Sequence, residues 1–180
     1  KRSVSFIILC YNEQCMVRQN IRSGMRRVAY HWKKQFLNRV CIQGGTILTN
    51  AVFLNNDRKM PLLGLGVYKA TGENEAENAI ISAVKCGYRM IDTASAYKNE
   101  ENVGRGIARC GIPRKELFIT TKIWNNAQRL GDVEGAFQRS LDRLGLDYID
   151  LYLIHWPVPG CYLSTWKEME KILSSGRALS

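Results

Sequence analysis

Four polar side chains in this chain could together reduce a carbonyl group. Asp92 ends a short apolar run, Tyr97 follows five residues later, and Lys122 and His155 end two later apolar runs. Reduction of an aldehyde or ketone needs a hydride donor and an acid that protonates the forming alkoxide. A phenol is a weak acid, with an ordinary pKa of about 10, and a neighbouring ammonium makes its proton easier to release.

The pattern predicts one role for each of these groups. Tyr97 donates the proton, and Lys122 stabilises the phenolate that remains. Asp92 pairs with Lys122 and holds it in place, while His155 forms a hydrogen bond with the carbonyl oxygen and orients it. General acid catalysis of this kind contributes about 10²–10⁴ in rate.

Each group also has a purely structural interpretation. Asp92 could cap the loop that follows it, Tyr97 could be a packing residue, and Lys122 could be a solvated charge. A histidine beside Trp156 could equally be structural. The four groups stand at three successive strand ends and one loop, and that combination favours the chemical interpretation.

These groups meet only if the strands that carry them are parallel neighbours. From residue 48 on, short apolar segments alternate with helical patterns in units of about thirty residues. Such alternation implies parallel strands joined by right-handed crossovers. The expected strands are 62–67, 88–92, 117–122 and 149–155. The expected helices are 75–86, 99–111, 133–145 and 165–176.

The polar residues at the carboxyl ends of the strands are typical of a (β/α)₈ barrel. A doubly wound sheet is disfavoured because Gly64-x-Gly66 has no third glycine and no helix start after it. The predicted fold is α/β, a partial (β/α)₈ TIM barrel of about four βα units plus an N-terminal hairpin at 52–60. Residues 177–180 resemble the start of a fifth strand. Capping-box pairs are expected for two helices, at Asn74 with Glu77 and at Thr165 with Glu168.

The N-terminal segment differs in charge from the rest of the chain. Residues 1–44 hold nine Lys and Arg and one acid, a net charge of +8, whereas residues 45–180 contribute only +2. Because the charge is confined to this segment, a nucleic-acid partner is not expected. The predicted organisation is a basic extension over 1–47 and a half barrel over 48–180.

The extension itself allows several interpretations. Its apolar residues at 17, 21, 25, 28, 32 and 36 have rough helical spacing, so it could be helical, or it could be a disordered, solvated segment. An Arg-rich, acid-poor segment can also be a mitochondrial transit peptide, and translated sequence that was never selected as protein is a further alternative. A cytoplasmic location is predicted, or a mitochondrial one if the segment is a transit peptide.

Metal and membrane partners are not expected. The six cysteines form no C-x-x-C pair and the chain has only two histidines, so a zinc site is disfavoured and reduced thiols of a cytosolic protein are predicted. No run of about 18 uncharged apolar residues is present, so no transmembrane helix is predicted.

From about residue 48 to its end, the chain resembles the aldo-keto reductases. Four stretches carry the resemblance. They are 64–68 (Gly-Leu-Gly-Val-Tyr), 91–100 (Ile-Asp-Thr-Ala, Tyr97 and Asn-Glu), 118–124 (Phe-Ile-Thr-Thr-Lys-Ile-Trp) and 144–157, which ends in His-Trp-Pro. The short loop 157–160 is similar to that of prostaglandin-F-synthase-like and microbial-type members.

The resemblance implies a site for each reactant. Asp92, Tyr97, Lys122 and His155 would form a catalytic tetrad with Tyr97 as proton donor, and NADPH would supply the hydride without a metal. Four residues would lie near the nicotinamide: Gly66, Val67, Tyr68 and Asp92. Three would line the pocket for a small-molecule carbonyl substrate: Trp124, Trp156 and His155.

The family barrel has eight strands, and much of its cofactor site follows the fourth. A half barrel would expose strand edges and apolar faces, so pairing of two half barrels is a further expectation. Two functions therefore stand at this point. One is NADPH-dependent reduction of aldehydes and ketones to alcohols. The other is a truncated, catalytically inactive member that lacks most of the cofactor site.

Overall fold

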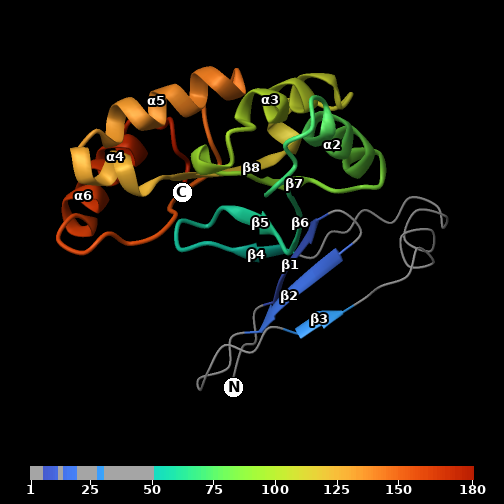
Figure 1. The fold of residues 1–180 in the computed structure, drawn as a ribbon, viewed down its shortest axis with the longest axis horizontal. Coiled ribbons are helices and arrows are strands. Elements are labelled where there is room, and N and C mark those ends of the chain that lie inside the picture. The colour runs from blue at the N-terminus through green and yellow to red at the C-terminus, as the bar shows by residue number, and fades with distance from the viewer. Residues whose placement is uncertain (1–5, 12–13, 20–27, 31–50) are drawn as a thin grey trace.

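A computed structural model of the protein describes residues 6–11, 14–19, 28–30 and 51–180 (Figure 1). Four parallel strands lie in chain order and alternate with helices. The strands are β6 (Leu63–Gly66), β7 (Met90–Asp92), β8 (Phe118–Ile123) and β9 (Leu151–Ile154). The main helices are α2 (Glu75–Lys85), α3 (Glu100–Arg109), α5 (Val133–Leu144) and α6 (Tyr162–Ser174). The predicted α/β alternation is confirmed.

The parallel register aligns the carboxyl ends of the strands. Leu65 pairs with Ile91, and Ile91 pairs in turn with Ile119. Lys122 of β8 pairs with Leu153 of β9. The start of a fifth strand is also confirmed, because Ala178 bridges to Ile149 in parallel. All residues that end these strands therefore lie at one edge of the sheet.

The core lies between the sheet and the helices, which cover one face of it (Figure 1). Each helix buries an apolar stripe because its apolar residues recur every three or four positions. Ile80 of α2 and Phe137 of α5 are fully buried, as are Ile91 and Ile119 of the sheet. The ring of Phe137 packs against that of Tyr152, with 4.7 Å between the centroids.

Helices α3 and α5 approach closely at a glycine. A Cβ added at Gly104 would collide with the backbone carbonyl of Leu144, at the end of α5. Only glycine fits there, since both obstructing atoms belong to backbone rather than to a flexible side chain.

A buried carboxylate joins three elements behind the strand ends. Glu100, at the start of α3, is 1% exposed. It accepts hydrogen bonds from Thr121 Oγ1 of β8 (2.7 Å) and from Arg143 of α5, whose Nη2 lies 2.6 Å from Oε2. Ser140 of α5 donates to the same Oε2. The start of α3 is thereby fixed against the end of β8.

A small hairpin, β4 (Ala51–Phe53) and β5 (Lys59–Pro61), precedes the parallel strands, as predicted. Before it, the N-terminal segment contains β1 (Phe6–Tyr11), β2 (Gln14–Gln19) and β3 (Val28–Tyr30). β1 pairs with β6 in parallel and with β2 in antiparallel. A helix was left open for this segment, and over these three strands that alternative is wrong. The sequence Phe-Ile-Ile-Leu-Cys-Tyr explains why, because β-branched and aromatic residues favour strands. Positions 21, 25, 32 and 36 of the expected helical stripe lie outside the described residues.

Neither expected capping box is formed. The Asn74 side chain makes no capping hydrogen bond, and the Glu77 carboxylate instead pairs with Arg105 and Arg109 of α3. Helix α6 begins at Tyr162, so Thr165 is buried inside it. At Glu77 a tertiary ion pair takes the place of the local contact, whereas the Thr165 hydroxyl is buried without a hydrogen-bond partner among the described residues. The sequence also missed the short helix α4 (Asn125–Leu130) after β8.

Candidate active site

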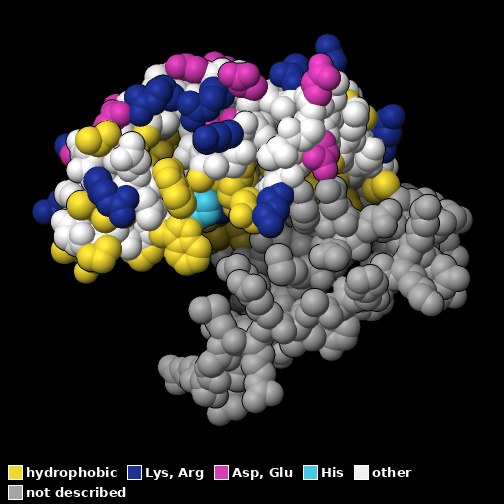
Figure 2. Space-filling model, viewed as in Figure 1, with side chains coloured by type: hydrophobic (Ala, Val, Ile, Leu, Met, Phe, Trp, Pro, Cys, Tyr) yellow, Lys and Arg dark blue, Asp and Glu magenta, His cyan; other side chains and the backbone are white. Residues whose placement is uncertain are grey.

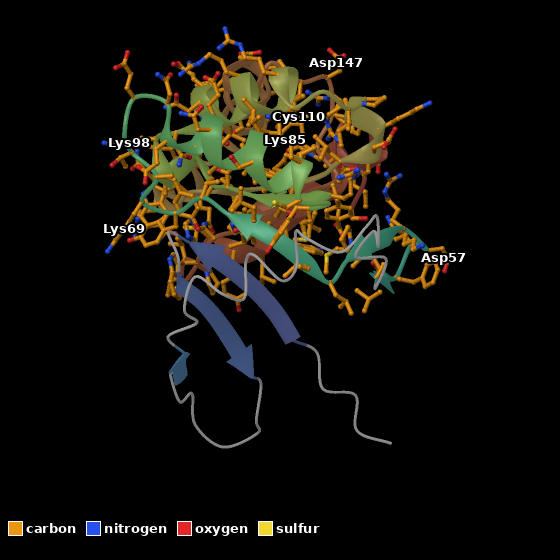
Figure 3. All side chains as sticks on the ribbon, turned by 90° about the vertical axis from the view of Figure 1, so that its right-hand side faces the viewer. Asp57, Lys69, Lys85, Lys98, Cys110 and Asp147 are labelled. Carbon is orange, nitrogen blue, oxygen red and sulfur yellow. The ribbon has the colours of Figure 1, made fainter. Side chains whose placement is uncertain are left out.

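The four predicted chemical groups come together at the carboxyl ends of the parallel strands. Asp92 ends β7, Lys122 lies one residue before the end of β8, and His155 directly follows β9. Tyr97 ends a short 3₁₀ turn at 95–97, after β7. Figure 3 shows that Lys69 and Lys98, from the loops after β6 and β7, lie on one side of the molecule, and that Asp57 lies on the other.

The Lys122 ammonium is held by three oxygens. Nζ donates to Oδ1 and Oδ2 of Asp92, both at 2.8 Å, and to the carbonyl oxygen of Thr93 at 2.7 Å. Burial raises the pKa of Asp92, and Lys122 opposes that rise. The net direction is upward because desolvation is the larger effect, but the bidentate contact still marks a fixed ion pair. The predicted role of Asp92, holding Lys122, matches this geometry.

Tyr97 lies between the ammonium and the imidazole. Lys122 Nζ is 5.3 Å from the centroid of the Tyr97 ring, and the ring centroid of His155 is 5.5 Å away. The turn that carries Tyr97 is fixed to β8, since Ser95 Oγ donates to the Lys122 carbonyl oxygen at 2.9 Å. The ammonium therefore lies over the face of the Tyr97 ring, in the geometry of a cation–π contact.

The surroundings of His155 favour the neutral form of its imidazole. Burial lowers the pKa of the imidazole, and the Lys122 charge lowers it further. Its Nδ1 is buried without a hydrogen-bond partner among the described residues. The ring lies 5.1 Å from that of Trp124 and stacks with Trp156 at 6.2 Å. In Figure 2 the histidine shown in cyan is surrounded by hydrophobic side chains.

The residues expected near the nicotinamide lie beside these groups. Gly66 pairs with Asp92 across β6 and β7, and the Val67 N–H donates to the Asp92 carbonyl oxygen at 3.1 Å. The Tyr68 ring is 54% exposed and stands 4.9 Å from that of Tyr97. An exposed aromatic face next to the acid offers a surface on which a planar nicotinamide ring could lie, so these residues fit that part of the cofactor.

The two tryptophans expected at the substrate pocket flank the imidazole and remain accessible. Trp124 is 40% exposed and Trp156 is 58% exposed. A side chain that sequence reasoning missed holds one of them, because Gln128 Nε2 donates to the Trp156 carbonyl oxygen at 2.9 Å. Gln128 is buried in α4, a helix with no apolar period to reveal it.

Asn99 and Thr93 were also given no role from the sequence. Asn99 was expected only as the first residue of a helix. In the structure its buried amide crosses to the loop after β6, and Thr93 Oγ1 donates to its oxygen at 3.1 Å. No spacing rule predicts such a contact, because it joins two loops.

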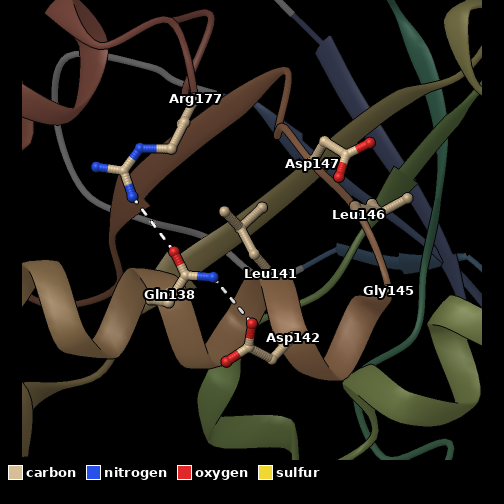
Figure 4. A pocket seen from close by; sticks show the side chains of 7 residues that line it. All are labelled: Gln138, Leu141, Asp142, Gly145, Leu146, Asp147 and Arg177. Carbon is tan, nitrogen blue, oxygen red and sulfur yellow. Dashed lines mark hydrogen bonds between the residues drawn. The ribbon is translucent and has the colours of Figure 1, made fainter.

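Other site types find little support in the described part of the chain. Among those residues, no group of three or more His, Cys, Asp or Glu could hold a metal ion, and no helix is long and apolar enough to cross a membrane. A cavity of about 370 Å³ lies near the end of α5, lined in part by Leu141, Asp142 and Arg177 (Figure 4). None of the predicted site residues lines it.

Comparison with known proteins supports one family. The model of the "Aldo/keto reductase family" matches residues 62–180. Glyoxal reductase of Bacillus subtilis is 51% identical over 132 residues, which is 73% of this chain and 48% of that protein. The 9,11-endoperoxide prostaglandin H2 reductase of Trypanosoma cruzi is 50% identical over 68% of this chain and 44% of its own length.

Solved structures give the same result. An aldo/keto reductase from Brucella melitensis superposes with a TM-score of 0.70 and 45% identity, over 73% of this chain and 52% of that one. A Bombyx mori aldo-keto reductase in complex with NADP gives a TM-score of 0.69 and 40% identity, over 75% and 50%. These neighbours confirm the partial barrel. The chain spans about half the length of the curated relatives it matches.

Proposed function

Because the chain belongs to the aldo/keto reductase family, we propose that it reduces aldehydes or ketones to alcohols, with Tyr97 as the proton donor and NADPH as the source of hydride. The observation that carries the proposal is the position of the Lys122 ammonium, which contacts both Asp92 and Tyr97. Lys122 is fixed by Asp92 and lies 5.3 Å from the Tyr97 ring. A positive charge held there, with a neutral imidazole alongside, suits proton donation by a phenol.

The residues divide the work of that step. The neutral His155 ring hydrogen-bonds to the carbonyl oxygen and turns it toward Tyr97. The Tyr97 O–H then passes its proton to that oxygen as negative charge develops on it, and the phenolate that remains is stabilised by Lys122. Asp92 keeps the ammonium in place throughout. Trp124 and Trp156, which flank the His155 ring, would line the pocket for the substrate.

NADPH, when bound, supplies the hydride that reaches the carbonyl carbon. Gly66, Val67, Tyr68 and Asp92 would hold its nicotinamide end. The solved relative from Bombyx mori is a complex with NADP, which supports this choice of cofactor. The substrate is a small carbonyl compound, and glyoxal is the first to test because the Bacillus subtilis relative is a glyoxal reductase.

An inactive member of the family is the second candidate. The chain spans about half the length of its relatives, so NADPH binding by the chain itself is the property that separates the two candidates. Such a protein would retain the four catalytic groups but bind NADPH too weakly for turnover.

Two further proposals concern where and with what the protein acts. A cytoplasmic location is proposed, with neither nucleic acid nor membrane as partner. If residues 1–47 are a transit peptide instead, a fluorescent fusion of the whole chain will enter mitochondria and a fusion without 1–47 will not. Equal distribution of the two fusions would contradict the transit peptide.

The proposed activity is tested by adding NADPH and glyoxal to the purified chain and following the loss of NADPH absorbance. Y97F is the matched variant, since it removes only the acidic O–H. We expect Y97F to lower the rate by about 10²–10⁴ while NADPH fluorescence titration gives an unchanged Kd. Equal rates for both proteins would exclude Tyr97 as the donor. A wild-type chain that binds no NADPH would support the inactive alternative.

A further inference from the structure

We propose that Asn99 is a positioning residue, which holds the turn that carries Tyr68 against the segment that carries Tyr97. The turn, residues 67–70, is called the Tyr68 turn below. Asn99 thereby sets the spacing between the two tyrosine rings, where the proposed function places the nicotinamide. The expected effect of Asn99 on NADPH binding rests on the proposed function. The contact of Asn99 with the Tyr68 turn does not, because it involves only residues of the protein.

The Asn99 amide uses both of its N–H groups on one turn. Nδ2 donates to the carbonyl oxygen of Val67 at 2.8 Å and to that of Ala70 at 3.1 Å. The residue is 3% exposed, and Val67 and Ala70 are equally buried. Breaking either bond would leave an N–H of the Asn99 amide buried without a partner, so the two bonds hold the turn firmly.

The Tyr68 turn has a shape that needs such support. The Ala70 N–H donates to the Val67 carbonyl oxygen at 3.1 Å, which closes a β-turn with Tyr68 and Lys69 at its centre. Lys69 has a φ of 65°, a left-handed conformation that is unfavourable for a residue with a side chain. Asn99 binds both ends of this turn, and Tyr68 stands exposed at its tip.

The other side of Asn99 is fixed to the catalytic groups. Its oxygen accepts from Thr93 Oγ1 at 3.1 Å, and the Thr93 carbonyl oxygen accepts from Lys122 Nζ. Tyr97 lies two residues before Asn99 in the chain. One side chain therefore connects the loop after β6 with the loop after β7, and the 4.9 Å between the Tyr68 and Tyr97 rings follows from that connection.

The variant N99D tests the proposal because it keeps the size of the side chain and the oxygen that accepts from Thr93. It removes the two hydrogen bonds that the amide donates to Val67 and Ala70, and places a carboxylate oxygen opposite their carbonyl oxygens. N102D is the matched control, since it makes the same chemical change one turn further along α3, at a half-buried residue. The readout on the free protein is the nuclear Overhauser effect between the ring protons of Tyr68 and Tyr97. We expect it in the wild type and in N102D, and its loss in N99D. An unchanged effect in N99D would overturn the proposal.

A measurement on the wild type does not depend on whether N99D folds. Both side-chain amide protons of Asn99 should exchange with deuterium at least about 100-fold more slowly than those of the exposed Asn78. Equally fast exchange at the two residues would also overturn the proposal.

The effect on cofactor binding is measured by titrating each protein with NADPH. We expect N99D to raise the Kd about 10-fold, the equivalent of one lost hydrogen bond, and N102D to leave it unchanged. If the wild type binds no NADPH, the proposed function fails, while the ring contact and the exchange rates still decide the role of Asn99.

Discussion

At the scale of single residues, the site is built around the ion pair of Asp92 with Lys122. Asp92, Tyr97, Lys122 and His155 stand where parallel strands must end, so their convergence follows from the alternation of strands and helices. The third acceptor of Lys122 is the Thr93 carbonyl oxygen. Every residue has a backbone carbonyl, so the sequence could not predict this contact.

The histidine gives a prediction about pH. In the unfolded chain the pKa of His155 is close to 6.5, and burial lowers it in the folded protein. As the pH falls below 6.5, the unfolded chain therefore takes up a proton that the folded chain resists, and folding stability falls. H155Q should lose less stability than the wild type between pH 7.5 and pH 5.5 in urea unfolding. His31 is present in both proteins and cancels. An equal loss would show that His155 does not titrate in this way.

At the scale of elements, buried polar contacts decide how the helices meet the strands. Glu100 has no exposed side-chain surface, whereas the Arg143 side chain remains 35% exposed. The two partners should therefore respond unequally to substitution, since only Arg143 can return to water.

R143M should destabilise the protein by about 3–5 kcal/mol, because it leaves the Glu100 carboxylate buried without its cation. E100Q should cost less, about 1–3 kcal/mol, since the amide still accepts from Thr121. R139M breaks an exposed pair with Asp132 and should change stability by less than about 1 kcal/mol. Chemical denaturation of the three variants measures the order, and an R143M variant no worse than R139M would refute the account.

The contact of α3 with α5 gives a second prediction at this scale. G104A should destabilise by about 1–3 kcal/mol, because its methyl group forces the two helices apart at Leu144. G135A is the control within α5, where the added Cβ meets the movable carboxylate of Asp132. It should be neutral or stabilising, since alanine favours a helix by up to about 1 kcal/mol over glycine. Thermal unfolding of both variants compares them, and the reverse order would contradict close packing at Gly104.

Helix boundaries show where prediction from sequence stops. The ends of α2 and α5 could be predicted within one residue, because Gly87 and Gly145 adopt the left-handed conformation that follows a helix end. The start of α6 could not be predicted in this way. Threonine is a common N-terminal capping residue, but Thr165 is buried inside the helix. Glu77 likewise has a local and a tertiary partner within reach, and two arginines outweigh one backbone N–H.

At the scale of the whole molecule, apolar surface remains uncovered on α6. Four of its large apolar side chains are exposed, between 44% and 67%: Tyr162, Leu163, Trp166 and Leu173. Helix α2 packs against α3, α3 against α5 and α5 against α6, and the described residues contain no further helix after α6. The expected pairing of half barrels would cover this face.

We therefore expect the chain to associate as its concentration rises, and sedimentation velocity measures this directly. Replacing Leu163 and Leu173 together by Lys should shift the protein toward monomer, because charge opposes burial of the face. Leu130→Lys is the control, as Leu130 is 72% exposed but lies on α4. A wild type that stays monomeric at every concentration would contradict pairing, and an equal effect of Leu130→Lys would show that α6 is not the surface used.

The register of the parallel strands also bears on how the chain folds as it is made. Leu65 pairs with Ile91 across 26 residues, Ile91 with Ile119 across 28, and Lys122 with Leu153 across 31. Every strand from β6 to β9 thus finds its partner within one strand–helix unit, and short loops close at low entropic cost. On the ribosome, each unit can dock on the one before it as soon as its strand emerges. The four proposed catalytic groups would then be assembled in order of synthesis, with the imidazole arriving last.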